Sequence, residues 1–279
     1  MRNHSSKFTR WLVIAAALIS GMPSLAHAAP TAAMPGVTLC VDDNFPPFEY
    51  ADPALKKLGQ HVVRGSTISL VNGILKPYGI PYQIKWYPFS RCMAEVEQGS
   101  IDVGLDAYYD PDRARMLTYS KPYFSLTPQY FYSKKRYPNG LNITSTQDLK
   151  KYKGCGIHGY SYLHYGLRAQ DLFNNDSLSD AGLVHMVQYN RCDYFVEELE
   201  VLQGLALTEQ AILKIPDLGH ASVPGAESPQ LYFFLSKSSQ TTQWLLPILN
   251  HEISRLKAKG DVTHLVSAEL RRNPGTPPH

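Results

Sequence analysis

Residues 39–50 read LCVDDNFPPFEY, and this stretch decides how the chain is interpreted. The apolar residues of 37–41 predict a buried strand, which runs directly into two acids, two prolines and several aromatic side chains. Proline fixes its own backbone φ angle, so the loop after the strand is stiff. Charged and aromatic groups on a stiff loop at a strand end predict one wall of a cleft, with Asp42 and Phe45 oriented before a small ligand arrives.

The first 28 residues have the features of a secretory signal. Basic residues open the segment, the apolar run WLVIAAALISGM follows, and AHA at 26–28 offers a cleavage site after Ala28. A membrane anchor that stays attached is the alternative. Removing 28 of the 279 residues leaves 251, in which 24 Lys and Arg balance 24 Asp and Glu. This balance argues against nucleic acid or an anionic membrane as a partner, because both bind basic surfaces.

All four cysteines lie in the part expected to be exported: Cys40, Cys92, Cys155 and Cys192. An even number of cysteines in an oxidising compartment predicts two disulfides. Zinc is the alternative, but the sequence contains no C-x-x-C pair. The count by itself leaves three pairings open.

Two segments that start 100 residues apart resemble each other. RCMAEVEQGSIDVGL begins at Arg91 and RCDYFVEELEVLQGL begins at Arg191, with Arg-Cys, Val-Glu and Gly-Leu in register. This similarity indicates two lobes built on one plan, in which a cysteine opens the same helix of each lobe.

Strands and helices alternate along the chain, which is typical of mostly parallel sheets. In the first lobe we expect strands at 37–41, 81–86 and 101–106 and a helix at 66–78. In the second lobe the expected order is strand 154–158, helix 162–173, strand 183–188, helix 191–199 and strand 201–207. The extended runs 129–133 and 230–235 are interpreted as two crossover strands, and a helix that ends at Gly260 is expected to return to the first lobe.

These elements give the expected limits of the two lobes. The first comprises 29–127 and 236–270, the second 128–235, and 271–279 is expected to be a disordered tail. One bridge in each lobe then pairs Cys40 with Cys92 and Cys155 with Cys192, because a bridge between lobes would lock a hinge. Each bridge is expected to contribute roughly 3–4 kcal/mol by restricting the unfolded chain.

Three segments together resemble the family 3 periplasmic solute-binding proteins, which feed ABC importers of polar amino acids. They are CVDDNFPPFEY, RCMAEVEQGSIDVGLDAYYDPDRARMLTYSKPYF and TSTQDLKKYKGCGIHGYSY, and they lie in this order between residues 40 and 162. The resemblance implies an α/β fold of the type II periplasmic binding protein kind, with two α/β lobes joined by two crossover strands. It further implies a periplasmic monomer, an inner-membrane ABC permease as partner, and no cofactor or metal.

The resemblance also implies ligand-binding positions in this sequence. Asp42 is expected to make a polar contact, Phe45 and Phe89 to sandwich the ligand, and Arg113 to bind its α-carboxylate. Tyr108 occupies a position that usually carries a small hydroxyl residue. Ser161 matches a hydroxyl at a helix start in the second lobe.

Other positions depart from the family pattern. Thr208, followed by Glu209, aligns where the family has an aspartate for the α-amino group, and Asp106 replaces a small residue near Arg113. The ligand is therefore either an amino acid with altered amine contacts or a compound that is not an amino acid.

Each of these residues has an ordinary structural alternative. A guanidinium group suits two-pronged binding of a carboxylate, but Arg113 can equally form an ion pair with Asp106, Asp110 or Asp112. The two phenylalanines can be core residues, and Asp42 and Asp106 can cap loops or helices instead of meeting an ammonium group. Ser161 can be a plain N-cap rather than part of an anion site.

Enzymatic alternatives find less support in the sequence. GYS at 159–161 lacks the glycine that would complete G-x-S-x-G, and the spacing of His158 and His164 does not suit metal ligands. A dehydratase-like cleft enzyme remains an alternative, with Asp42, Asp106 or Glu209 as its acid–base residues. A ligand-sensing module of the same fold is a further alternative.

Overall fold

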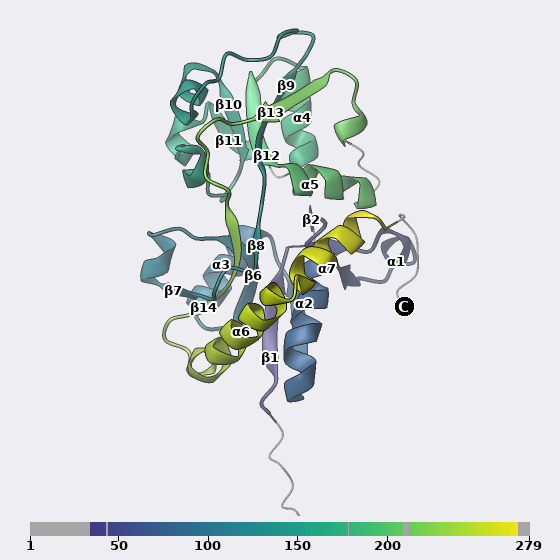
Figure 1. The fold of residues 1–279 in the computed structure, drawn as a ribbon, viewed down its shortest axis with the longest axis vertical. Coiled ribbons are helices and arrows are strands. Elements are labelled where there is room, and N and C mark those ends of the chain that lie inside the picture. The colour runs from purple at the N-terminus through teal and green to yellow at the C-terminus, as the bar shows by residue number, and fades with distance from the viewer. Residues whose placement is uncertain (1–33, 43, 178, 209–211, 273–279) are drawn as a thin grey trace, which may run out of the picture. The chain divides into compact units, whose positions relative to one another are not determined.

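A computed structural model of the chain describes residues 34–42, 44–177, 179–208 and 212–272. The residues from Ala33 onward form a single unit by their contacts. Their strands gather into two large sheets and one small sheet (Figure 1). The predicted signal segment, Glu209 and residues 273–279 lie outside the described ranges. Of the expected tail, 271 and 272 are described, and Arg272 Nη1 lies 3.2 Å from Glu269 Oε1.

The first sheet has the strand order β5-β1-β6-β14-β7, and β8 also pairs with β14. β1 runs parallel to β5 and β6, whereas β14 runs antiparallel to β6, β7 and β8. Its strands are β1 (Val37–Val41), β5 (Tyr82–Trp86), β6 (Val103–Tyr108), β7 (Leu117–Tyr119), β8 (Phe124–Ser125) and β14 (Gln230–Ser236). The first lobe, as we use the term, is built on this sheet.

Helices cover both faces of the first sheet. Leu39 and Val41 of β1 pack in the core with one set of helices, while Cys40 between them packs with another. Successive side chains of a strand point to opposite faces, so a strand covered on both sides is apolar throughout. The first set is α2 (Ser66–Leu75), α6 (Gln240–Ala258) and α7 (Asp261–Leu270), and the helix on the other face is α3 (Phe89–Glu97).

The second sheet has the strand order β11-β10-β12-β9-β13, and the second lobe is built on it. β10 is parallel to β11 and β12, and β9 is antiparallel to β12 and β13. Its strands are β9 (Pro128–Ser133), β10 (Gly154–Ile157), β11 (Asn174–Ser177), β12 (Tyr194–Glu198) and β13 (Leu218–Ser222). Helix α4 (Asp180–Gln188) packs against it, and α5 (Leu199–Gly204) follows β12.

The remaining elements are short. The small antiparallel sheet consists of β2 (Asn44–Phe45), β3 (Glu49–Ala51) and β4 (Val63–Arg64), and α1 (Pro53–Lys57) lies between the last two in sequence. Short 3₁₀ helices span 76–78, 113–115, 146–151, 163–165, 169–171, 205–208 and 212–214.

The chain crosses between the large sheets twice, as expected. It enters the second sheet between β8 and β9 and returns between β13 and β14. The two strands expected to cross each belong to one sheet, however. Because β14 is hydrogen-bonded to β6, residues 230–235 belong to the first sheet and not to the second lobe. The other expected limits of the lobes stay predictions.

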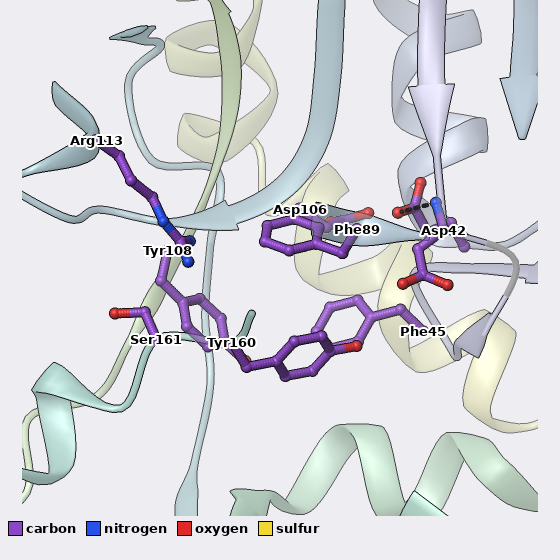
Figure 2. Close-up of a pocket in the computed structure, with 9 residues that line it drawn as sticks. Asp42, Phe45, Phe89, Asp106, Tyr108, Arg113, Tyr160 and Ser161 are labelled. Carbon is purple, nitrogen blue, oxygen red and sulfur yellow. Dashed lines mark hydrogen bonds between the residues drawn. The ribbon is translucent and has the colours of Figure 1, made fainter. Parts of the chain in front are cut away.

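The parallel pairing of β1 with β6 positions the site. Parallel strands end at the same edge of a sheet, so the residues that follow them meet there. Asp42 comes directly after β1, Tyr108 ends β6, and Phe89 begins α3. Figure 2 shows their side chains gathered at this edge.

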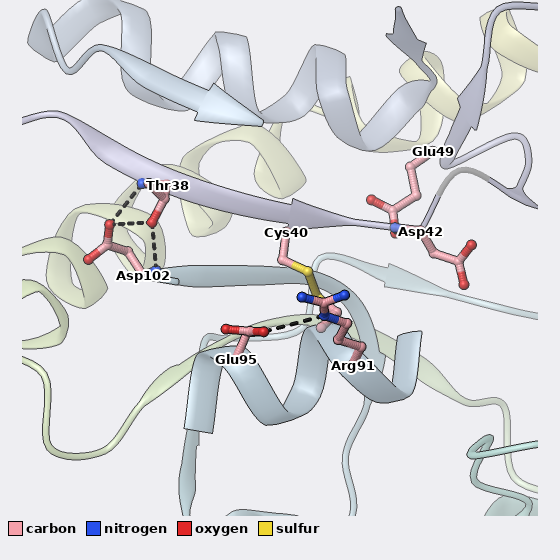
Figure 3. Close-up of a disulfide and its surroundings, with 8 residues drawn as sticks. Thr38, Cys40, Asp42, Glu49, Arg91, Glu95 and Asp102 are labelled. Carbon is pink, nitrogen blue, oxygen red and sulfur yellow. Dashed lines mark hydrogen bonds and ion pairs between the residues drawn. A yellow bond between two sulfur atoms is a disulfide. The ribbon is translucent and has the colours of Figure 1, made fainter. Parts of the chain in front are cut away.

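Both predicted disulfides are present. Cys40 of β1 is bonded to Cys92 of α3 (Figure 3), and Cys155 of β10 is bonded to Cys192. The Cα atoms are 5.7 and 6.0 Å apart, within the usual range for a bridge. Each bridge stays within the elements of one sheet.

The secondary structure expected for the second lobe is wrong in several segments. Residues 162–173 hold two 3₁₀ turns instead of a helix, 183–188 belong to helix α4, 191–199 contain strand β12, and 201–207 are helical. The β-branched residues of 183–188 suggest a strand. In the helix that forms instead, Leu183, Val184 and Val187 are buried at helical spacing. The strand β11 was missed because it consists of polar residues.

The proposed repeat is wrong in register. Cys92 lies inside a helix, whereas Cys192 lies two residues before the start of a strand, so the two Arg-Cys pairs are not equivalent. The matching helix–strand units, α3–β6 and α4–β12, are offset by 91 residues at the start of both elements.

An aspartate supports each unit at the same place. The Thr38 N–H and hydroxyl donate to Asp102 Oδ2, both at 2.8 Å (Figure 3). The Lys153 N–H donates to Asp193 Oδ2 at 2.8 Å. Both aspartates lie just before the central strand of their sheet and bind the neighbouring parallel strand. They are therefore equivalent residues of the two units that are offset by 91.

Replacing either aspartate should destabilise its lobe. We expect Asp102→Ala and Asp193→Ala each to lower the free energy of unfolding by about 1–3 kcal/mol, because each leaves a backbone N–H without its acceptor. Urea denaturation measures the change, with the exposed Asp112→Ala as control, expected within about 0.5 kcal/mol of the unsubstituted chain. Losses no larger than that of the control would contradict the assigned role.

Candidate functional site

A cavity lies where the carboxyl ends of β1 and β6 meet residues 160–161 of the second lobe (Figure 2). Its volume is about 20 Å³, which is room for about one water molecule. A larger ligand therefore requires the walls to move. The lining residues are Asp42, Phe45, Glu49, Phe89, Asp106, Tyr108, Arg113, Tyr160 and Ser161.

The structure brings together seven of the eight residues selected from the sequence. These are Asp42, Phe45, Phe89, Asp106, Tyr108, Arg113 and Ser161. Thr208 does not line the cavity: its hydroxyl donates to the carbonyl of Leu205 at 3.0 Å and closes the turn after α5. The alignment that placed Thr208 in the site assumed a strand at 201–207. The structure has helical turns there instead.

Arg113 faces the cavity, and no acidic side chain of the described residues pairs with it. Its Nη2 donates to the carbonyl of Gly159 at 2.7 Å, and its Cζ lies 5.6 Å from the centroid of the Phe89 ring. Of the acids considered as partners, Asp112 pairs with Arg115, and Asp110 accepts the Ser161 hydroxyl. Among the described residues, no carboxylate oxygen lies within 4.0 Å of this guanidinium. The group keeps donors for an anionic ligand.

Aromatic rings form the apolar walls. Phe89 meets the Tyr160 ring of the second lobe edge-on, with 5.8 Å between centroids. Phe45 is both wall and core, since it lines the cavity, is only 6% exposed, and packs 5.4 Å from the Phe48 ring. Tyr160 was not selected from the sequence, although it stands directly before the selected Ser161.

Asp42 and Ser161 have structural duties as well. Asp42 Oδ1 accepts the Asn44 N–H at 3.1 Å, and the Asp42 N–H donates to Glu49 Oε1 at 3.0 Å. Ser161 donates to Asp110 Oδ2 at 3.1 Å. The helix that was expected to start at Ser161 is only the 3₁₀ turn 163–165, so the predicted helix-start anion site is not formed there.

A β-bulge aims Asp106 into the site. Gly104 of β6 pairs with Phe234 of β14, and Ala107 pairs with Tyr232. Three steps along β6 thus correspond to only two steps along β14, so β6 carries one extra residue. Asp106 has φ +56°, in the left-handed region that non-glycine residues rarely adopt. Bulges of this kind redirect a side chain and are common beside active sites.

The Asp106 carboxyl group is buried and only half satisfied. Its side chain is 6% exposed, and Oδ1 accepts the Thr67 hydroxyl at 2.8 Å and the Tyr123 hydroxyl at 2.6 Å. Oδ2 has no hydrogen-bond partner in the described part of the chain. Desolvation raises the pKa of Asp106 to about 7, although the bonds from Tyr123 and Thr67 act in the opposite direction.

Two adjacent acids of the second lobe were missed in the sequence. Glu198 ends β12 and reaches the first lobe: its Oε2 accepts the Tyr108 hydroxyl at 2.5 Å, and its Oε1 lies 2.9 Å from His164 Nε2 and 3.1 Å from the Tyr165 hydroxyl. Burial opposes ionisation of Glu198, but hydrogen bonds from Glu197, His164 and Tyr108 lower its pKa to about 2. Burial, and then the charge of Glu198, raise the pKa of Glu197.

Within the pair, ionisation is therefore favoured at Glu198 and opposed at Glu197. Glu197 and Glu198 have the same sequence signal as Asp106. In both cases an acid ends an apolar run, YFVEE here and VGLDAY in the first lobe. The signal at Glu197 and Glu198 was missed because residues 191–199 were expected to form a helix.

Two larger cavities adjoin the central one. One, of about 400 Å³, shares Asp42, Phe89 and Tyr160 with it and extends along Trp86. The other, of about 440 Å³, shares Tyr108 and Ser161 and extends toward Glu227. The central cavity is thus the narrow middle of a longer cleft.

The burial of Asp106 should be visible in the pH dependence of stability. Because its folded pKa lies above its unfolded value of about 4, the wild type loses stability as the pH rises from about 4 to 7. Asp106→Asn removes this loss, and asparagine tolerates the same positive φ. The variant should gain about 1–3 kcal/mol over the wild type between pH 5 and pH 8, measured by chemical denaturation.

Asp112→Asn, on an exposed side chain, is the control for this measurement. A difference between Asp106→Asn and wild type that stays constant from pH 5 to pH 8 would contradict a buried, titrating Asp106. The groups that share its surroundings are Asp42, Glu49, Arg113 and Tyr123.

The described residues contain no group of three or more His, Cys, Asp or Glu residues placed to hold a metal ion. In the same part of the chain no helix has both the length and the apolar character needed to cross a membrane.

Comparisons with known proteins agree with this architecture. A solved amino acid ABC transporter substrate-binding protein from Streptococcus pneumoniae Canada MDR_19A, bound to L-arginine, is 19% identical with a TM-score of 0.67, over 85% of this chain and 94% of that one. A histidine kinase sensor domain is 17% identical with a TM-score of 0.65, over 85% and 96%. An ancestral amino-acid-binding protein, a precursor of cyclohexadienyl dehydratase, is 18% identical with a TM-score of 0.64, over 85% and 96%.

At these identities the likeness shows the fold. A comparison with curated proteins gives no match. The family model for bacterial extracellular solute-binding proteins, family 3, matches residues 37–268, which include both large sheets and the cavity. The chain therefore belongs to the bacterial extracellular solute-binding proteins, family 3.

Proposed function

We propose that this chain captures a small carboxylate-bearing ligand in the periplasm and presents it to an ABC importer of the inner membrane. The observation that carries the proposal is the Arg113 guanidinium, which faces a cavity with aromatic walls and has no acidic partner among the described residues. Charge-assisted, two-pronged bonds to a carboxylate suit this group. The export signal at 1–28, its cleavage after Ala28 and a monomeric state are parts of the proposal.

Ligand binding would use both lobes. The first lobe offers Arg113, Phe45 and Phe89, while Tyr160 and Ser161 belong to the second. Because the cavity holds only about 20 Å³, the ligand must enter when these walls are apart and be enclosed when they approach. An enclosed ligand gives the pair of lobes a shape that a permease can distinguish from the unliganded one.

The shared fold includes a sensor domain and a dehydratase precursor, so the fold does not separate transport from sensing or catalysis. Incubating the purified protein with a compound that binds, and recovering that compound, distinguishes catalysis from binding. We expect it back unchanged, and a converted product would favour the cleft enzyme. Uptake of the compound by cells with and without the gene distinguishes transport from sensing.

Arg113 provides the first test of binding. In a thermal-shift screen of amino acids and small organic acids, a ligand of the folded state must raise Tm. Arg113→Ala should abolish the shifts given by carboxylates and leave the unliganded Tm within a few degrees, because among the described residues its side chain donates one hydrogen bond, to the Gly159 carbonyl. Arg115→Ala, on a side chain that is 79% exposed, is the control. A large loss of unliganded stability in Arg113→Ala would show a structural role instead.

Gly204 provides a test of the approach between the lobes. A Cβ atom there would lie 2.4 Å from the carbonyl carbon of Pro46, in the loop that carries Phe45. Gly204→Ala must therefore push α5 away from that loop, and we expect at least a tenfold loss of affinity by calorimetry. Gly73→Ala is the matched control, since a Cβ there meets nothing within 4 Å. Unchanged affinity in Gly204→Ala would show that binding does not need this contact.

A further inference from the structure

A short hydrogen bond joins the two lobes beside the central cavity. The hydroxyl of Tyr108, which ends β6 in the first lobe, donates at 2.5 Å to Oε2 of Glu198, which ends β12 in the second lobe. Bonds from a hydroxyl to an ionised carboxylate are about 2.5–2.7 Å long and roughly twice as strong as bonds between neutral groups. The contact between these two strand ends therefore belongs to the stronger class of hydrogen bonds.

The second lobe fixes Glu198 in position for this contact. Its Oε1 accepts the Tyr165 hydroxyl at 3.1 Å and lies 2.9 Å from His164 Nε2, and its backbone N–H donates to Glu197 Oε1 at 3.0 Å. The side chain is buried, with 2% of the residue exposed. Oε2 is thus held as the acceptor for the first lobe.

The protonation states suit the direction of donation. Although burial opposes it, hydrogen bonds from Glu197, His164 and Tyr108 lower the pKa of Glu198 to about 2, which favours the carboxylate. Burial, and then the charge of Glu198, raise the pKa of Tyr108, which favours its protonated hydroxyl. Separating the lobes would take one donor away from this carboxylate, and such a loss is costly for a buried charged acceptor.

Each partner is fixed to its own sheet beside a crossover of the chain. Tyr108 pairs with Leu231 of β14, the strand that follows the return to the first sheet. Glu198 pairs with Pro128, the first residue of β9, which follows the crossing into the second sheet. A rotation about the crossovers that separates the two sheets therefore stretches the bond between Tyr108 and Glu198.

Two other hydrogen bonds between the lobes use groups that line the cavity. Arg113 Nη2 donates to the Gly159 carbonyl at 2.7 Å, and the Ser161 hydroxyl donates to Asp110 Oδ2 at 3.1 Å. A ligand in the cavity competes for the donors of Arg113 and Ser161. Glu198 is not among the described residues that line this cavity, so its contact with the first lobe does not depend on what the cavity encloses.

The approach of the lobes leaves little space between them. The cavity at their meeting point has a volume of about 20 Å³, which is room for about one water molecule. Contacts between the lobes themselves therefore hold this arrangement. The bond from Tyr108 to Glu198 is the contact among them that combines a buried acceptor with a favoured negative charge.

We propose that Tyr108 and Glu198 form a clasp that holds the two lobes together when no ligand is enclosed. The unliganded chain then rests mainly in a closed form and breaks this bond each time the cleft opens. The inference goes beyond the proposed function, because it concerns the chain without a ligand and holds for transport, sensing or catalysis alike.

The test measures the distance between the lobes in the unliganded protein, which is refolded from urea to remove bound compounds. Spin labels are attached at Lys85→Cys of β5 and Asp176→Cys of β11. Both sites are exposed, and both strands lie at the edge of their sheet away from the crossovers. The four native cysteines are bonded in two pairs, so the labels react with the introduced thiols. Pulsed electron paramagnetic resonance then gives the distribution of distances.

The variant is Tyr108→Phe, which removes the hydroxyl and keeps the ring. Tyr165→Phe is the matched control, because its hydroxyl donates to the same carboxylate from within the second lobe. We expect one main short distance in the wild type and at least a threefold larger fraction of long distances in Tyr108→Phe. Tyr165→Phe should keep the distribution of the wild type. Far-ultraviolet circular dichroism shows that each variant is folded.

A second variant, Glu198→Gln, tests whether the two residues act through one bond. It should also increase the fraction of long distances, and adding Tyr108→Phe to it should change the distribution less than Tyr108→Phe changes the wild type. Independent effects of the two substitutions would refute a direct clasp.

Three further results would overturn the inference. They are a wild type that is mainly open, a distribution that Tyr108→Phe leaves unchanged, and an equal shift in Tyr165→Phe. The last would show that weakening the surroundings of the carboxylate, and not losing the bond between the lobes, is what separates them.

Discussion

The parallel pairing of β1 with β6 is the constraint on which the site depends. It brings two strand ends to one edge, so that Asp42 and Asp106, 64 residues apart in sequence, face one cavity. The pairing is held by the hydrophobic residues of both strands, by Asp102 at its start and by the disulfide from β1 to α3. Helices pack on both faces of the sheet, and the cavity lies at its carboxyl edge.

The two lobes share one plan, but the acids at their strand ends differ in their hydrogen-bond partners. In the second lobe the carboxylate of Glu198 is hydrogen-bonded by Tyr108, Tyr165 and His164, and burial beside it raises the pKa of Glu197. In the first lobe Asp106 retains an unpartnered oxygen, and Arg113 has no acidic partner among the described residues. The unmet groups of opposite charge therefore lie on one lobe, while the acids of the other link the lobes through Tyr108.

Strain and unmet polarity coincide at Asp106. A positive φ in a non-glycine residue, a bulge and a buried acceptor without a donor each cost stability. Folding alone does not require them, as the regular pairing of β12 in the equivalent position demonstrates. Such costs are concentrated at functional sites, where the surrounding structure keeps them in place.

The sequence by itself determined the α/β class, the two crossovers, both disulfides and seven of the residues that line the cavity. It could do so because apolar runs, cysteine number and acids at strand ends are local signals. It did not determine the secondary structure of the second lobe. The valines of helix α4 favour a strand and the glutamates of strand β12 favour a helix, and in both elements packing overrides propensity. Only the tertiary structure decided that Asp106 sits on a bulge, that Glu198 is already satisfied and that Arg113 has no acidic partner among the described residues. The reason is that hydrogen-bond partners from distant segments become known only when the chain is folded.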